Sequence, residues 1–141
     1  FNNQGTIVMR TCTFDGNHAE EGGGAVYTFR GGTIEMQACT FDGNHASLGG
    51  AIYNNEGTME MRTCTFDGNH AESGGAVYTW KGTIEMQACA FDGNHAGQGG
   101  GAIFKDQGTM AVHDCTFTDC SAEVLPCPSP APPSACDGTL G

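Results

Sequence analysis

A repeat of about 25 residues runs through most of this sequence and constrains its fold more than any other feature. The segment Thr-Phe-Asp-Gly-Asn-His-Ala, with Ala in first place in the last copy, occurs four times. A Gly-Thr pair marks the start of each repeat unit, and its threonines are Thr6, Thr33, Thr58, Thr83 and Thr109. They are 27, 25, 25 and 26 residues apart. A period of about 20 to 50 residues is typical of solenoids, propellers and arrays, and this one is short for a propeller blade or a helical repeat.

Alternating residues within each repeat predict a half-buried strand. In Thr33–Cys39, the apolar residues Ile34 and Met36 alternate with polar ones, which is the period of a strand rather than of a helix. We expect a second strand at Gly49–Tyr53, and the Asp-Gly-Asn segment between the two indicates a turn. Two or three short strands and three corners per repeat predict one turn of a parallel β-helix, with successive turns about 4.8 Å apart.

The repeats predict an all-β solenoid of four to five turns over residues 1–122. The pattern is lost in the last turn, where Thr-Asp-Cys-Ser replaces Asp-Gly-Asn-His, as expected where a solenoid ends. Residues 123–141 hold all five prolines and are expected to form an extended, polyproline-like tail. Phe1 aligns with Tyr53, part-way along a repeat, so we also expect the sequence to be a fragment of a longer chain.

The charge of the chain narrows the choice of partners. There are 16 Asp and Glu against five Lys and Arg, a formal net charge of -11. Such a chain repels phosphate backbones, which argues against nucleic acid as a partner. No apolar run approaches the roughly 20 residues that cross a bilayer as a helix, so we expect no membrane span in this segment.

In a β-helix, equivalent positions of successive turns stack into rows, called ladders here. We expect one inward ladder of aromatic core residues, consisting of Phe14, Phe41, Phe66, Phe91 and Phe117. An asparagine amide has both a donor and an acceptor, so stacked amides can hydrogen-bond to one another continuously. This predicts a second inward ladder, consisting of Asn17, Asn44, Asn69 and Asn94. Both ladders are interpreted as structural.

Two other ladders leave a structural and a metal-binding interpretation open. One consists of Asp15, Asp42, Asp67 and Asp92 at the turn, and the other of His18, His45, His70 and His95, which we expect to face solvent. Rows of carboxylates and imidazoles can chelate a divalent metal. Alternatively, each Asp caps its own turn through a hydrogen bond, and each His is a repeated surface residue. Repulsion between solvated charges about 5 Å apart is only about 1 kcal/mol in water, so we predict neither a metal nor a cofactor. A further row, Glu35, Glu60 and Glu85, is predicted to be a solvated outer face.

The cysteines fall into two groups. The first is a ladder of small buried residues, consisting of Cys12, Cys39, Cys64, Cys89 and Cys115. Parallel β-carbons about 4.8 Å apart lie beyond the usual disulfide range of about 3.5–4.5 Å, which favours free thiols but leaves strained bridges open. In the second group, Cys127 and Cys136 flank the proline run and are predicted to form a disulfide, which implies an oxidising compartment.

Two motifs that occur together resemble a known family. Each Phe-Asp-Gly-Asn is followed by Gly-Gly-Ala and then Val or Ile, at Gly23–Val26, Gly49–Ile52, Gly74–Val77 and Gly100–Ile103. This pairing of Phe-x-x-Asn with Gly-Gly-Ala-[Ile/Leu/Val] resembles the repeats of chlamydial polymorphic outer-membrane proteins, over about 120 of the 141 residues. The resemblance implies a right-handed parallel β-helix outside the cell or at its surface, with a structural or adhesive role. Other subunits, further repeats or cell-surface glycans are the partners that we expect.

Three functions compete, and we expect the first, a non-catalytic extracellular structural or adhesive module. The second is a polysaccharide-binding or polysaccharide-active β-helix similar to pectate lyases. Such enzymes have a unique cluster of charged residues, whereas here every carboxylate at a motif position has copies, so we predict that the chain is not an enzyme. The third is ice binding by a flat threonine face, indicated by Thr-Cys-Thr at Thr11–Thr13 and Thr63–Thr65 but interrupted in the turns between them.

Overall fold

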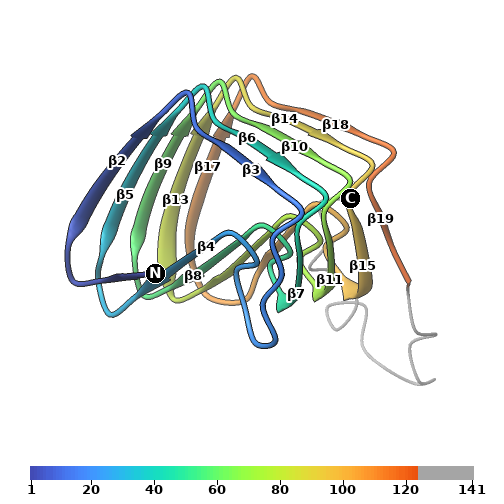
Figure 1. The fold of residues 1–141 in the computed structure, drawn as a ribbon, viewed down its shortest axis with the longest axis horizontal. Helices are drawn as coiled ribbons and strands as arrows, with labels where there is room; N and C mark the ends of the chain where they lie inside the picture. The colour runs from blue at the N-terminus through green and yellow to red at the C-terminus, as the bar shows by residue number, and fades with distance from the viewer. Residues whose placement is uncertain (124–141) are drawn as a thin grey trace.

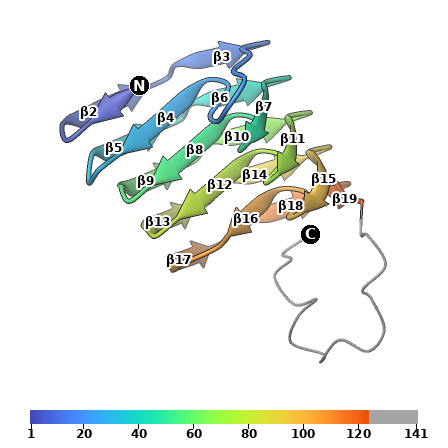
Figure 2. The same ribbon diagram turned by 90° about the horizontal axis from the view of Figure 1, so that it is seen from below.

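A computed structural model describes residues 1–123, which form an all-β parallel solenoid of about five turns. Each turn, called a rung here, contributes strands to up to four sheets, and equivalent strands of successive rungs pair in parallel (Figure 1). Figure 2 shows the rungs stacked from the N-terminal to the C-terminal side. Within residues 1–123 no helix is long and apolar enough to cross a membrane. The prediction of a parallel β-solenoid is confirmed.

Four sheets form the walls of the solenoid, numbered I to IV in the order in which a rung visits them. Sheet I contains β1 (Asn2–Asn3), β4 (Val26–Phe29), β8 (Ile52–Asn55), β12 (Val77–Trp80) and β16 (Ile103–Lys105). Sheet II contains β2 (Thr6–Arg10), β5 (Thr33–Gln37), β9 (Thr58–Arg62), β13 (Gly82–Gln87) and β17 (Gly108–His113). Sheet III contains β3 (Thr13–Asp15), β6 (Thr40–Asp42), β10 (Thr65–Asp67), β14 (Ala90–Asp92) and β18 (Thr116–Thr118). Sheet IV contains β7 (His45–Leu48), β11 (His70–Ser73), β15 (His95–Gly99) and β19 (Ser121–Ala122).

The register of the sheets places equivalent residues of the repeat opposite each other. In sheet III, Phe66 pairs with Phe41 on one side and with Phe91 on the other. In sheet II, the repeat-marking threonines align in the same way, as Thr33 does with Thr58. Side chains alternate between the two faces of a strand, so a slip of one residue would turn every apolar side chain outward. The alternation seen in the sequence therefore fixes this register.

The core consists of inward ladders that are continuous through the central rungs. The members of sheet II, Ile34, Met36, Met59, Met61, Ile84 and Met86, are at most 2% exposed. Phe41, Phe66 and Phe91 of sheet III are at most 1% exposed. Their rings stack almost parallel, with centroids 4.8 and 4.6 Å apart. Phe14 and Phe117, in the first and last rungs, continue this stack but are only half-buried.

The asparagine ladder lies inward at the corner between sheets III and IV. The Nδ2 of Asn44 donates to the Oδ1 of Asn69 at 2.9 Å, and the Nδ2 of Asn69 donates to the Oδ1 of Asn94 at 2.9 Å. Asn17 donates to Asn44 in the same way. The backbone N–H of Asn44 also donates to the Oδ1 of Asn69, at 3.0 Å. Because Asn44, Asn69 and Asn94 are 0% exposed, this column gives buried amide groups the partners that burial requires.

Every rung after the first has four strands, more than the two or three predicted from the sequence. Asp42 still belongs to β6 and His45 already begins β7, so only Gly43 and Asn44 form the corner between them. Gly43 has φ +58, and a Cβ there would meet nothing within 4 Å, so its glycine is needed for conformation. Gly50 is needed for space instead, because a Cβ there would lie 2.2 Å from the carbonyl oxygen of Gly75.

The corner between sheets II and III has a different geometry, which the sequence analysis did not predict. Its residues have φ of 50–52° although none is glycine: Thr11, Ala38, Thr63, Ala88 and Asp114. A left-handed conformation costs a non-glycine residue about 1–2 kcal/mol. The backbone at this corner is therefore strained, and the stacking of the rungs offsets the free-energy cost of that strain.

Candidate functional site: the outward ladders

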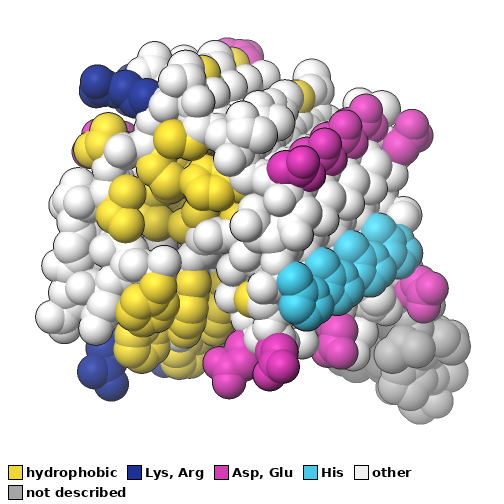
Figure 3. All heavy atoms as spheres, viewed as in Figure 1, with side chains coloured by type: hydrophobic (Ala, Val, Ile, Leu, Met, Phe, Trp, Pro, Cys, Tyr) yellow, Lys and Arg dark blue, Asp and Glu magenta, His cyan; other side chains and the backbone are white. Residues whose placement is uncertain are grey.

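A row of histidines lies on the outside of the solenoid, beside and at the start of sheet IV: His18, His45, His70 and His95. The rings of neighbouring rungs stack with centroids 5.0 Å apart. Figure 3 shows them as one continuous band of imidazoles. Partial burial of the ring, and then the charges of His45 and His95, lower the pKa of His70, while Glu123 acts in the opposite direction. His70 therefore binds a proton less readily than an isolated imidazole does.

A second outward row ends the strands of sheet III and consists of Asp15, Asp42, Asp67 and Asp92. All four are exposed, and Figure 3 shows an acidic band parallel to the histidine band. The glycine after each of these residues has φ between +57 and +60, which gives the turn a cause other than an Asp cap. Within residues 1–123, no group of three or more His, Cys, Asp or Glu side chains could hold a metal ion. The structure thus places the acidic and histidine rows side by side without joining them into a ligand cluster.

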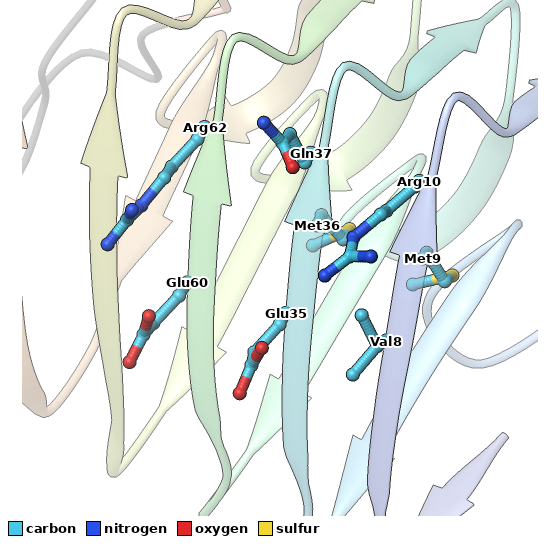
Figure 4. Close-up of a pocket in the computed structure, with 8 residues that line it drawn as sticks. All are labelled: Val8, Met9, Arg10, Glu35, Met36, Gln37, Glu60 and Arg62. Atoms are coloured by element: carbon cyan, nitrogen blue, oxygen red, sulfur yellow. The ribbon is translucent and has the colours of Figure 1, made fainter.

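Sheet II carries a shallow depression of about 210 Å³ on its outer face. Arg10 and Arg62, from alternate rungs, and Gln37 between them line one side of it (Figure 4). Glu35 and Glu60 line the other side, with their carboxylates pointing in the same direction (Figure 4). Two carboxylates and two guanidinium groups therefore surround one open depression, which gives this face the donors and acceptors that hydrogen-bond hydroxyl-rich molecules.

The outer face of sheet I carries a row of aromatic residues that we call the aromatic strip. Its members are Phe1, Tyr27, Tyr53, Tyr78 and Phe104, with Phe29 and Trp80 beside them. The rings of Tyr27 and Tyr53 stack at 4.9 Å and 4°, whereas Tyr53 and Tyr78 meet edge to face at 5.3 Å and 81°. Partial burial, and then the charges of Tyr27 and Tyr78, raise the pKa of Tyr53 to about 12. The hydroxyl group of Tyr53 is therefore neutral at physiological pH.

Two cations lie over rings at the edge of the aromatic strip. The guanidinium carbon of Arg30 lies 4.8 Å from the centre of the Phe29 ring. The Nζ of Lys81 lies 4.1 Å from the centre of the Trp80 ring, two rungs further on. Such cation–π contacts are worth about 0.5–1 kcal/mol at exposed sites. They hold both cations against the outer face of sheet I.

Comparison with known proteins identifies the family. The model of one family, described as a right-handed β-helix region, matches residues 1–126. The chain belongs to the right-handed β-helix family. Searches of curated proteins and of solved structures found no match for this β-helix. The family includes both pectate-lyase-like enzymes and non-enzymatic members, so membership alone does not distinguish between a catalytic and a non-catalytic role.

The cysteine ladder lies on the inner side of the β-helix, and its members are free thiols. Cys120 beside the ladder is also a free thiol. Cys39, Cys64 and Cys89 are at most 1% exposed, and Cys12 and Cys115 are half-buried. The hydrogen bond with Cys64, and then burial, raise the pKa of the Cys89 thiol. A protonated, covered thiol such as that of Cys89 is a poor nucleophile. The predicted pair Cys127 and Cys136 lies outside the described residues 1–123, as does most of the proline-rich tail.

The threonines considered for ice binding do not form two rows on one flat face. Thr13 and Thr65 point outward from sheet III, where Ala90 takes the equivalent place in a later rung. Thr11 and Thr63 lie at the strained corner, with φ of 50° and 51°, and not on the sheet. The Thr-Cys-Thr motif therefore bends around the corner between sheets II and III.

The aromatic strip and the depression were not predicted from the sequence. A signal for the strip was present, because an aromatic residue directly follows each Gly-Gly-Ala-[Val/Ile] motif. The depression was harder to find, because Arg10 and Arg62 occupy only alternate rungs. Glu35 and Glu85 are exposed and Glu60 is half-buried. This glutamate row therefore lies on the outer face of the solenoid, as predicted from the sequence.

Proposed function

We propose that this β-helix is a non-catalytic structural or adhesive module that works at the cell surface or outside the cell, as part of a larger assembly. The observation that carries the proposal is the copying of one outward side chain from rung to rung, as in the histidine row with its 5.0 Å period. A catalytic site needs several different groups in one place. A surface that binds a repetitive or extended partner is built by repetition instead.

Two features of the sequence support the proposed location. The paired Phe-x-x-Asn and Gly-Gly-Ala motifs resemble the repeats of chlamydial polymorphic outer-membrane proteins. The cysteines Cys127 and Cys136 on either side of the proline run suit an oxidising compartment. The net charge of -11 favours solubility and disfavours non-specific binding to nucleic acid.

The adhesive role can be tested with substitutions that the chain itself makes elsewhere. Ser121 occupies the place of histidine in the last rung, so a variant with His45→Ser and His70→Ser should fold. Ala90 occupies the place of Thr65, so Thr65→Ala is a matched control on another row. Beads coated with the wild-type chain should adhere to cells or to extracellular matrix, the double variant should adhere several-fold less, and the control should adhere normally. Wild-type beads that adhere no better than beads with heat-denatured chain would contradict the adhesive role.

The depression on sheet II favours a second candidate, a polysaccharide-active β-helix. Glu35 and Glu60 come from paired rungs, about 4.8 Å apart, and retaining glycosidases use two carboxylates about 5–5.5 Å apart. Incubation with pectin, xylan and β-glucan, followed by assays for new reducing ends and for unsaturated products, separates the two candidates. We expect no release of either. Release that is lost in Glu60→Gln would establish the second candidate.

A further inference from the structure

We propose that the aromatic strip of sheet I is the docking face for a second copy of this chain, related to the first by a two-fold axis so that the two solenoid axes are antiparallel. This inference rests on the proposed role in an assembly and specifies one contact within it. Aromatic residues and Arg are enriched in the buried centres of protein interfaces. The strip combines five successive aromatic rings with Phe29, Trp80 and the cation of Arg30.

The charges beside the strip are self-complementary. Arg30, Glu56 and Lys81 occupy one corner on three successive rungs, with φ of 52°, 60° and 56°, and all three are exposed. The order of charges along the strip is therefore positive, negative, positive. A two-fold axis between the rungs of Glu56 and Lys81 places Glu56 of each copy opposite Lys81 of the other. The same axis brings Arg30 to the rung of the second copy that carries Lys105 and Asp106, whose exposed charges are of opposite sign.

The same axis also aligns an unpaired buried group with a donor. Asn55 lies in register between Phe29 and Trp80 and is 7% exposed. Its Oδ1 has no hydrogen-bond partner, while its Nδ2 lies 3.5 Å from the Tyr27 hydroxyl. An unpaired buried amide oxygen is costly, so such a group marks a place where a donor is missing. The two-fold axis brings Trp80 of the second copy, whose indole N–H only donates, to the rung of Asn55.

The angles between neighbouring rings also favour this position of the two-fold axis. Stacking is near parallel on either side of the middle of the strip, 4° for Tyr27 with Tyr53 and 15° for Tyr78 with Phe104, whereas Phe1 meets Tyr27 edge to face at 73°. The stack is broken between Tyr53 and Tyr78, where the angle is 81°. This is the position of the proposed axis. A turned ring there can meet the ring edges of the second copy in the edge-to-face arrangement that aromatic pairs prefer.

A flat protein surface suits the strip better than a sugar chain does. Sugars stack on open ring faces, but two ring pairs of this strip, Tyr27 with Tyr53 and Tyr78 with Phe104, cover each other's faces, and Arg30 and Lys81 lie over Phe29 and Trp80. Five rungs about 4.8 Å apart and a width of about 20 Å give on the order of 450 Å² per copy. This is less than the roughly 800 Å² per partner of a stable complex, so the association should be weak and dependent on concentration.

Sedimentation of the full chain at concentrations from about 5 µM to about 1 mM tests the proposal. We expect wild type to shift from monomer to dimer within this range. Glu56→Lys, which makes all three charges positive, should remain monomeric, and the double variant Arg30→Glu/Lys81→Glu, with three negative charges, should too. An equimolar mixture of these two variants should form a heterodimer. Lys81 already has the backbone conformation of Glu56, so Glu56→Lys should fold.

Glu35→Lys, on the outer face of sheet II, is the matched control, because it makes the same change of charge away from the strip and should leave dimer formation unchanged. The proposal is overturned if wild type stays monomeric at about 1 mM, if Glu56→Lys dimerises as wild type does, or if the mixture stays monomeric. It is also overturned if the emission of Trp80, the single tryptophan of the chain, changes on adding soluble polysaccharide while the protein stays monomeric. Release of sugar products would contradict the proposed function and not the dimer, whereas an inactive, adhesive monomer would contradict only the dimer.

Discussion

Replacement of Asn69 by leucine tests whether the amide column holds the rungs together. The Nδ2 of Asn69 donates to the Oδ1 of Asn94 at 2.9 Å and to the Phe41 carbonyl at 3.1 Å. Its Oδ1 accepts from the backbone N–H and the side-chain amide of Asn44, at 3.0 and 2.9 Å. A leucine side chain in this place would leave two hydrogens of Asn44 and one lone pair of Phe41 without these partners, in a site that is 0% exposed. At about 1–3 kcal/mol for each of these three stranded groups, the free energy of unfolding should fall by about 3–9 kcal/mol.

Asp67→Ala is the matched control, because Asp67 is an exposed residue of the same corner. Substitutions of this kind usually change stability by less than about 0.5 kcal/mol. Urea denaturation, followed by circular dichroism and by the emission of Trp80, should give a much lower midpoint for Asn69→Leu and an unchanged one for Asp67→Ala. If the two variants shifted the midpoint equally, hydrogen bonding along the column would not be what stabilises the corner.

Three further predictions follow from the corners and the histidine row. Gly50→Ala should lower the melting temperature far more than Gly43→Ala. The Cβ of Ala at position 50 would lie 2.2 Å from a carbonyl oxygen of the next rung, whereas at position 43 only the positive φ disfavours Ala. Similar losses in the two variants would show that backbone conformation alone decides the cost. Thr63→Gly should raise stability by about 0.5–1 kcal/mol in urea denaturation, because glycine relieves a φ of 51°; a loss would show that this corner is not strained. The lowered pKa of His70 means that the unfolded chain binds its proton more readily, so the melting temperature should fall as the pH drops below about 6.5. His70→Ser should reduce this fall, and an identical pH profile in that variant would refute the role of the row.

The rung and its register could be predicted from the sequence because both depend on strong local signals. Ile34 and Met36 alternate with polar residues, and this alternation sets which face of sheet II is buried. The spacing of the Gly-Thr pairs sets the number of residues per rung. Asn44 has a copy of itself, Asn69, as its neighbour in the next rung, so an asparagine at this buried corner is understandable only as a member of the ladder.

Other features could not be predicted, because they depend on the neighbouring rung and not on the local sequence. His45–Leu48 becomes strand β7 through pairing with β11, although its residues show no clear alternation. Thr63 adopts a conformation that its own side chain disfavours, and only the adjoining strands impose it. Strand formation depends on such cross-strand contacts more than on intrinsic preference. The function of the outward rows is harder still to predict, because it depends on a partner outside the chain.

The stacking of rungs also determines how the molecule would respond to mechanical force. Each rung contacts chiefly the rungs directly before and after it, through parallel strands and the amide column. Tension applied to the two ends of the chain would therefore load the outermost rung first and peel rungs off one at a time. A rung of 25 residues would release about 85 Å of extended chain. Under load this β-helix would lengthen in nearly equal steps, and the unfolding of each rung would dissipate part of the applied mechanical work.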